Sequence, residues 1–113
     1  MDLRDLIPEE DVVLFGLLRE VITADGKYSD AERGQITAIT KELGKSRVEK
    51  AMAEAGKRFP TRAALKDAAK LVTRPEARMA ILSFLEKVAA ADETTAEEDK
   101  PLKWLASWWD IAR

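Results

Sequence analysis

Two strongly apolar stretches, residues 8–24 and 75–91, dominate the pattern of hydrophobic and polar positions along the chain. In the first stretch, apolar residues follow the i, i+3, i+4, i+7 spacing of one helix face and spread beyond that face. A helix this apolar is too broad in its hydrophobic face for the surface, so we expect both stretches to form helices that cross at the centre of the fold. The first pattern consists of Leu14, Phe15, Leu17, Leu18, Val21 and Ile22.

Proline and acidic residues predict where these two helices begin. Pro8 precedes three acidic residues and Pro75 precedes Glu76, and this pattern marks a helix start because proline is tolerated at the first helical position and the helix dipole favours negative charge there. Capping signals predict four further helices. Their N-caps are Ser29, Ser46, Thr61 and Thr95; Gly26 and Gly44 end the first two helices, and Pro101 predicts a kink, or a restart capped by Asp99, in the last.

The two middle helices carry smaller apolar stripes and are not expected to be stable alone. Within the first central helix, Gly16 costs about 1 kcal/mol relative to alanine, which suggests a close helix crossing at that residue. The predicted stripes are Val48, Ala51, Met52 and Ala55 in the third helix, and Ala64, Leu65, Ala68, Leu71 and Val72 in the fourth.

The first helix and the turn after it recur later in the chain at a fixed offset. Repetition of this kind indicates one structural unit used twice, and the dominance of Ala, Leu, Glu, Lys and Arg favours helix over strand. We therefore predict an all-α fold, a compact bundle of about six helices built from two related helix–loop–helix halves, with residues 1–113 forming one domain. The aligned pairs include Leu14 and Ile81, Leu18 and Leu85, Val21 and Val88, Asp25 and Asp92, and, after a one-residue gap, Glu32 and Glu98.

The chain contains neither cysteine nor histidine. Disulfides, thiolate and imidazole metal ligands, Ser-His and Cys-His nucleophiles and a histidine acid–base catalyst are therefore excluded. Because most small-enzyme chemistry depends on these groups, we do not expect an enzyme.

Charge is distributed unevenly, with net values of −5 over residues 1–40, +6 over residues 41–78 and −3 over residues 79–113. This asymmetry favours contacts between the middle of the chain and its ends; the alternative is a basic face that binds an acidic partner or an anionic membrane surface. Glu49, Glu54 and Asp67 interrupt the basic region and few aromatic residues accompany it, so no nucleic-acid partner is expected.

The first residues are acidic and lead into a broken apolar run, which resembles neither a signal peptide nor a transit peptide. No stretch approaches the roughly 20 apolar residues that a transmembrane helix needs. We therefore expect a cytoplasmic protein that does not span a membrane.

Asp25, Glu32, Asp92 and Glu98 are the candidate metal ligands. Each aspartate falls in the last turn of an apolar helix, where the dipole disfavours an anion, so either loop N–H groups stabilise it or a hard cation does. Glu32 and Glu98 are better explained as capping-box residues, each reaching back to the N–H of its own N-cap. The ions considered are calcium, magnesium and manganese, although neither loop has the spacing of an EF-hand. Because Gly26 turns the backbone freely, the first loop is expected to bind more tightly than the second.

Trp104, Trp108 and Trp109 lie within six residues of one another. One interpretation places them in the core and as a partial lid over a groove between helices. The other makes them an exposed patch that binds a partner or a second copy, because tryptophan is enriched at interface hot spots.

The repeat, the Ala24-Asp25-Gly26 turn followed by Glu32, and the Ala91-Asp92 turn followed by Glu98 resemble the TerB-like tellurite-resistance family over nearly the whole chain. The resemblance implies a compact helical domain of bacteria associated with tellurite resistance and stress, and relatives occur in membrane-anchored co-chaperones. It also implies that the four acidic residues are suspected metal ligands, although Glu93 replaces the second glycine.

Two functions follow as hypotheses. The first is a protein-interaction module that docks on partner proteins, including membrane-associated ones, with a divalent ion at the acidic turns. The second is a structural bundle that self-associates through its tryptophan face without metal.

Overall fold

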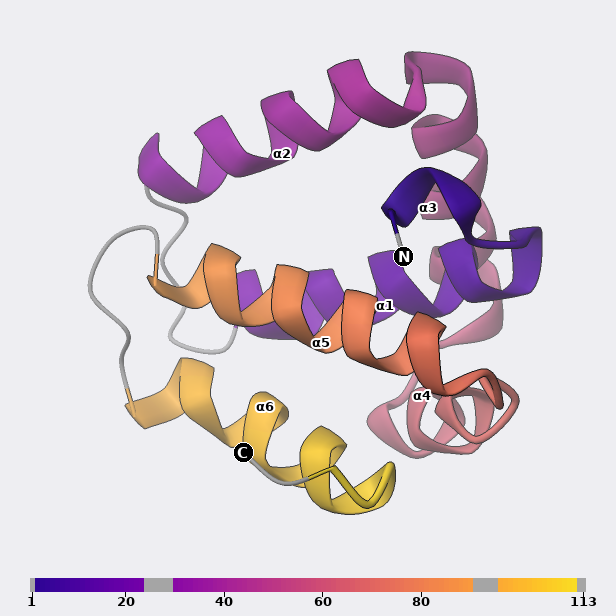
Figure 1. Cartoon of the computed structure of the whole chain (residues 1–113), viewed down its shortest axis with the longest axis vertical. Helices are drawn as coiled ribbons and strands as arrows, with labels where there is room; N and C mark the ends of the chain where they lie inside the picture. The colour runs from indigo at the N-terminus through magenta and orange to yellow at the C-terminus, as the bar shows by residue number, and fades with distance from the viewer. Residues whose placement is uncertain (1, 24–29, 91–95, 112–113) are drawn as a thin grey trace.

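The computed structural model describes residues 2–23, 30–90 and 96–111, and the side chains in these ranges except those of residues 96–99. This part of the chain contains helices and no strand, so the predicted all-α bundle of six helices is confirmed (Figure 1). The helices are α1 (Pro8–Thr23), α2 (Asp30–Leu43), α3 (Lys45–Arg58), α4 (Arg62–Ala69), α5 (Pro75–Ala90) and α6 (Ala96–Trp108), preceded by a short 3-10 helix η1 (Leu3–Asp5).

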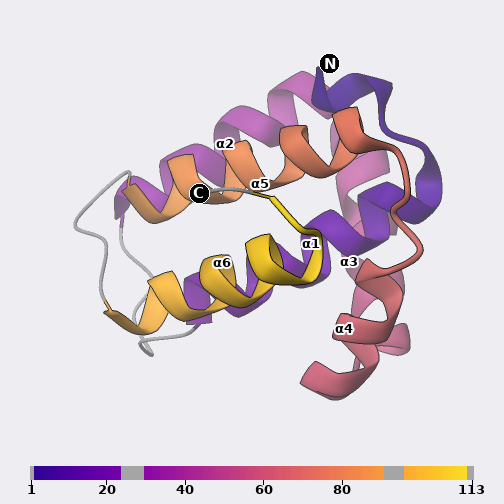
Figure 2. The same cartoon turned by 60° about the horizontal axis from the view of Figure 1, so that its bottom comes forward.

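Helix α1 lies at the centre of the bundle, as its apolar pattern predicts. It packs against α3, α4, α5 and α6, and Figures 1 and 2 show these helices arranged around it. Every residue from 10 to 18 is buried, including the two acidic residues at its start. Helix α5 is the second most buried element and contacts α1, α2, α6 and η1.

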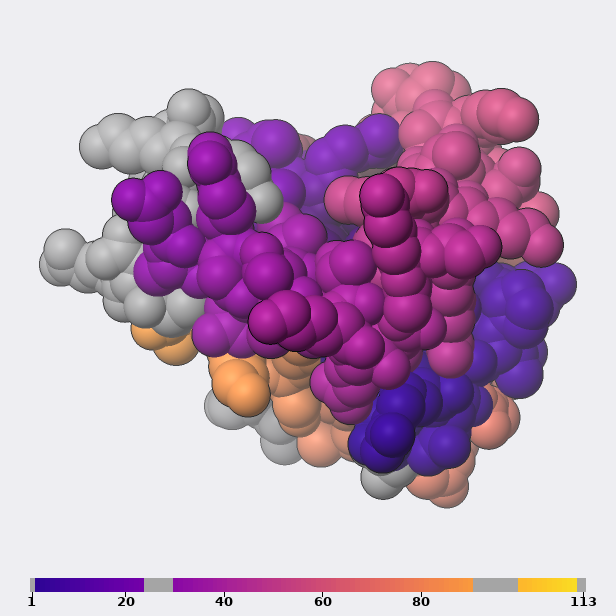
Figure 3. Space-filling view, turned by 90° about the horizontal axis from the view of Figure 1, so that it is seen from above, coloured from indigo at the N-terminus to yellow at the C-terminus, as the bar shows by residue number. Residues whose placement is uncertain are grey.

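The internal repeat is visible in the helix boundaries. Helices α1 and α5 both begin at a proline and both have 16 residues. Aligned side chains are buried to the same extent: Leu18 and Leu85 are buried, as are Val21 and Val88. The two halves nevertheless pack differently, since α5 contacts α6 directly whereas α2 contacts α3, α5 and η1. Figure 3 shows the N-terminal residues lying beside α2.

Three local predictions for the middle helices are wrong. Ser46 does not cap α3, because Gly44 adopts a φ of 97° at the N-cap and α3 begins at once, at Lys45. Leu71 is 72% exposed, because α4 ends at Ala69 and the turn that follows directs Val72 into the core instead. Met52 is 44% exposed beside the buried stripe of α3. The predicted cap at Thr61 is confirmed, since its hydroxyl accepts a hydrogen bond from the N–H of Ala64.

At Gly16, side chains from other segments approach the backbone of α1 closely, whereas the sequence suggests a close crossing of two helices. A Cβ atom at this position would lie 2.7 Å from Cδ2 of Phe59 and 2.9 Å from Cδ1 of Leu65. The missing side chain therefore makes room for the ring of Phe59, the residue that follows α3, against α1. At the other end of the chain, α6 continues through Pro101, so the alternative of a restart at Asp99 is wrong. The kink stays a prediction.

Candidate functional site

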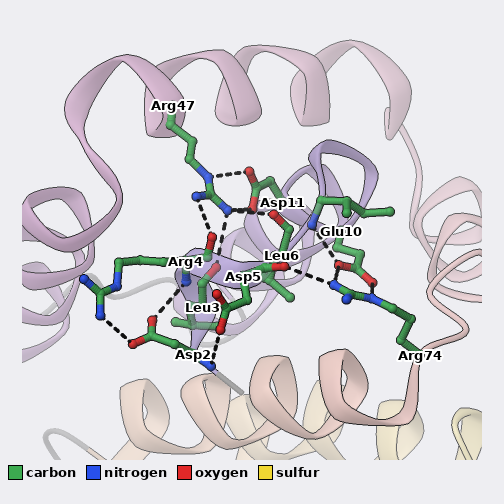
Figure 4. Close-up of polar contacts among 10 residues, drawn as sticks. Asp2, Leu3, Arg4, Asp5, Leu6, Glu10, Asp11, Arg47 and Arg74 are labelled. Atoms are coloured by element: carbon green, nitrogen blue, oxygen red, sulfur yellow. Dashed lines mark hydrogen bonds and ion pairs between the residues drawn. The ribbon is translucent and has the colours of Figure 1, made fainter.

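The most extensive polar network of the described residues surrounds the first turn of α1 (Figure 4). Glu10 and Asp11 are buried there, which is rare for carboxylates without a partner. The guanidinium of Arg47, on α3, donates two hydrogen bonds to the carboxylate of Asp11, from Nε at 2.7 Å and from Nη2 at 2.9 Å. Paired donors of this geometry form the strongest kind of side-chain ion pair.

Arg47 also holds the N-terminal segment in place. Its guanidinium donates to the backbone carbonyl oxygens of Leu3, Arg4 and Leu6 at 3.3, 3.1 and 2.9 Å. One side chain thus connects α3 to the start of α1 and to η1. Without Arg47, these carbonyl oxygens would lose their hydrogen bonds to water on folding and gain no replacement. Arg47 therefore acts as a structural bridge.

Arg74, immediately before α5, pairs with the second buried carboxylate. It donates to both carboxylate oxygens of Glu10 and to the backbone carbonyl of Asp5. Glu10 also accepts a hydrogen bond from the N–H of Ile7 at 2.9 Å. Arg74 chiefly, helped by this N–H, lowers the pKa of Glu10 below its ordinary value of 4.5 despite burial, which acts in the opposite direction.

The lowered pKa of Glu10 gives a pH prediction. A carboxyl whose pKa is lower in the folded state stabilises the fold above its unfolded pKa, and this contribution disappears as pH falls through the folded pKa. We expect Glu10→Gln to lose stability at neutral pH and to show a smaller further loss below pH 4.5 than the native chain. Urea denaturation over a pH series measures this, with exposed Glu9→Gln as the control. Parallel pH profiles for the native chain and Glu10→Gln would contradict the assignment.

The ion pairs support the first interpretation of the charge asymmetry, contacts within the chain, for three arginines of the middle region. Asp11–Arg47, Glu10–Arg74 and Glu20–Arg62 each join an acidic residue of the first 40 positions to a basic residue of the middle region. The predicted contacts between the middle of the chain and its end are therefore confirmed. The buried carboxylates of α1 form ion pairs with arginines, which link α1 to α3 and to the residue before α5.

The predicted metal ligands fall mostly outside the described part of the chain. Asp25 and Asp92 lie outside the described residues, and so does the side chain of Glu98. Glu32 is described and is only 3% exposed, in the first turn of α2. Among the residues that the structure describes, no group of three or more acidic side chains is arranged to hold a metal ion. The four-residue ligand set stays a prediction.

The three tryptophans have different surroundings. Trp109 is buried, and its Nε1 donates to the carbonyl oxygen of Ala69 at 2.9 Å, so a partner cannot reach it in this fold. Trp104 is half-buried. Trp108 is 41% exposed, and its Nε1 donates to the carbonyl oxygen of Lys66 at 2.9 Å. Of the predicted partner-binding residues, only Trp108 therefore presents a large surface to solvent.

Two lysines of the α4 region accompany these rings, and the sequence interpretation missed them. The Nζ of Lys66 lies 5.1 Å from the ring centre of Trp104, and that of Lys70 lies 4.5 Å from the ring centre of Trp108. Both distances suit cation–π interactions. The signal was present in the sequence, since the two lysines and the two tryptophans each recur four residues apart.

The fold and these contacts agree with the comparison to protein families. The family model described as tellurite resistance protein TerB matches residues 11–108. The chain belongs to the TerB family. The match begins at one of the paired acidic residues of α1 and ends at Trp108, so the TerB region contains all but the first turn of the six-helix bundle, while η1 precedes it.

Further comparisons add no relative to this TerB-family chain, since neither the curated proteins nor the solved structures gave a match. In the described part of the chain, no helix combines the length and the apolar character that crossing a membrane requires.

Proposed function

We propose that this TerB-family chain is a non-enzymatic protein-interaction module of a tellurite-resistance-type stress response, acting in the cytoplasm. The observation that carries the proposal is the exposure of Leu71 and Trp108 next to Lys70. Leu71 is 72% exposed and Trp108 is 41% exposed, and Lys70 connects them, because it precedes Leu71 in the chain and covers the ring of Trp108. Tryptophan is enriched at interface hot spots, and the exposed leucine adds apolar surface to this region.

The internal role of the buried carboxylates supports a binding function over a catalytic one. Glu10 and Asp11 are the buried acidic side chains of α1, and each forms an ion pair with an arginine. Arg74 lowers the pKa of Glu10, which makes this carboxylate poorly suited to proton transfer near neutral pH. The surface around Leu71, by contrast, has no such role within the fold.

A photo-crosslinking amino acid at position 71 tests this proposal. In cells challenged with tellurite, we expect a discrete crosslinked species from position 71, with a partner identified by mass spectrometry and then shown to bind as a purified protein. Position 79 is the matched control, because Met79 is a second exposed apolar residue, 50% exposed, on α5. Equal yields from positions 71 and 79, or no partner that binds when purified, would contradict the proposal.

Divalent-cation binding at the first acidic turn is a second candidate, favoured by the burial of Glu32 at the start of α2. Carboxylate oxygens are the ligands that these hard cations prefer. We propose Asp25 and Glu32 as the ligands of calcium, magnesium or manganese in this turn, and Asp92 and Glu98 as a weaker second pair.

Backbone NMR during titration with calcium, magnesium and manganese tests the cation proposal. We expect shifts around residue 25 at lower ion concentration than around residue 92, and the loss of the first set in Asp25→Asn. A preference of about tenfold corresponds to about 1.4 kcal/mol. Asp92→Asn is the control and should leave the first site unchanged. Saturation of the second turn first would contradict the ranking, and the absence of shifts in either turn would rule out both sites.

A further inference from the structure

Two lysines of the α4 region and two tryptophans of α6 form a regular pair of rows. Lys66 and Lys70 are one helical turn apart, and so are Trp104 and Trp108. Each lysine lies over one ring, at 5.1 and 4.5 Å from the ring centre. We call these four residues the Lys–Trp ladder. Trp108 also fixes the ladder to the backbone through its hydrogen bond to the carbonyl oxygen of Lys66.

The ladder leaves its ammonium groups available to an anion. A lysine that stacks on an indole face still has N–H groups that point away from the ring, because the ring interaction occupies one side of the ammonium. Among the described residues, the ion pairs of the structure do not include Lys66 or Lys70, whereas Arg58 and Arg62 are paired with Glu54 and Glu20. The two lysines therefore differ from their basic neighbours.

Leu71 adds an exposed apolar side chain next to Lys70 in the chain. Its side chain is 72% exposed, directly after Lys70, in the turn that leads from α4 to α5. The fold places Val72 in the core at this turn and leaves Leu71 outside. An exposed leucine thus directly follows, in the chain, the lysine that lies over the partly exposed indole of Trp108.

We propose that the Lys–Trp ladder and Leu71 bind an acidic amphipathic helix of a partner protein. This inference rests on the proposed function and names the chemistry of its partner. Two carboxylates one turn apart on the partner helix match the spacing of Lys66 and Lys70, because both pairs have the i, i+4 geometry. An apolar side chain between those carboxylates packs against Leu71 and Trp108, in the manner of helix-in-groove recognition.

Charge favours a helix of a protein over an anionic membrane as the occupant. Asp67 and Asp110 are both exposed next to the ladder in sequence, and the whole chain has a net charge of −2. A membrane surface presents continuous negative charge and would repel both aspartates, whereas a peptide can place its carboxylates on the lysines alone. The ladder and the residues next to it in sequence are therefore of mixed charge and suit a discrete ligand.

The test uses the full chain and two synthetic helical peptides. The acidic peptide carries two glutamates one turn apart that flank a leucine, and the matched peptide has glutamines in their place. Tryptophan fluorescence and the NMR signal of the Trp108 indole N–H report binding. We expect the acidic peptide to bind about tenfold more tightly than its glutamine counterpart, with an affinity that falls as salt is added.

Variants locate the binding surface. Lys70→Gln and Leu71→Asn are each expected to weaken binding of the acidic peptide by about five- to tenfold. Lys57→Gln is the matched control, because it removes the same charge from an exposed lysine near the end of α3 and should leave binding unchanged. Circular dichroism of each variant confirms that the bundle is folded.

Three results would overturn the inference: equal binding of the two peptides, equal effects of Lys70→Gln and Lys57→Gln, or binding to phosphatidylglycerol vesicles without binding to the acidic peptide. The proposed function is judged separately by crosslinking from position 71. Suppose that a specific partner is captured at position 71 and, when purified, still binds Lys70→Gln normally. That result would support the proposed interaction module and would contradict the proposed binding of an acidic helix. If no partner is captured, the proposed function itself fails.

Discussion

Replacing Arg47 with glutamine is expected to lower the free energy of unfolding by about 3 kcal/mol. The substitution leaves the carboxylate of Asp11 buried without its partner, and breaking one side of a buried ion pair typically costs about 3 to 5 kcal/mol. It also removes donors from the carbonyl oxygens of Leu3, Arg4 and Leu6. We place the effect at the lower end of the range because the Arg47 side chain is 28% exposed. Urea denaturation at neutral pH measures it.

Two further variants separate this explanation from a general loss of charge. Arg58→Gln removes an arginine whose pair with Glu54 is exposed to solvent, so its effect is expected to stay within about 0.5 kcal/mol. The double variant Asp11→Asn with Arg47→Gln should cost less than the sum of its single variants, since the two residues interact directly. Strict additivity, or equal costs for Arg47→Gln and Arg58→Gln, would contradict the role assigned to Arg47.

Leu18→Ala and Leu85→Ala are each expected to lower the free energy of unfolding by about 2 to 5 kcal/mol, the usual range for removing a buried leucine side chain. Leu18 is 1% exposed and Leu85 is fully buried, and the two occupy equivalent positions in the central helices of the two halves. Chemical denaturation measures both, and exposed Leu71→Ala serves as the control, with an effect within about 0.5 kcal/mol. Losses below about 1 kcal/mol for both buried positions would disprove their central placement.

The sequence predicted most helix boundaries because the signals that set them are local. Pro8 and Pro75 start the central helices where the first-turn rule places them, and the 3.6-residue spacing identifies the faces that the core covers. The errors occurred where one residue changed the path of the chain. Gly44 alone separates α2 from α3, and its positive φ lets the chain turn within one residue. A capping rule that selects Ser46 as the N-cap does not predict this tight connection.

The polar network and the exposed patch depend on tertiary contacts, and the sequence therefore predicted them only in part. Net charge indicated that the middle of the chain meets its start, but it could not select Arg47 and Arg74 from eleven basic residues of that region. The tryptophan spacing suggested a surface and did not show that Trp109 reaches the carbonyl of Ala69 in the core. Helical periodicity continued past Ala69 places Leu71 in the core, whereas α4 ends at Ala69 and Leu71 is exposed.

One experiment tests most directly the claim that this TerB-family chain acts through its surface. A bacterial host that expresses Leu71→Asn is challenged with tellurite and its survival is measured. The free energy of unfolding of the same variant is measured alongside. We expect the native chain to raise survival and Leu71→Asn to give survival no better than that of cells without the chain, while its stability stays within about 0.5 kcal/mol of native. Full protection by the stably folded variant would contradict the claim.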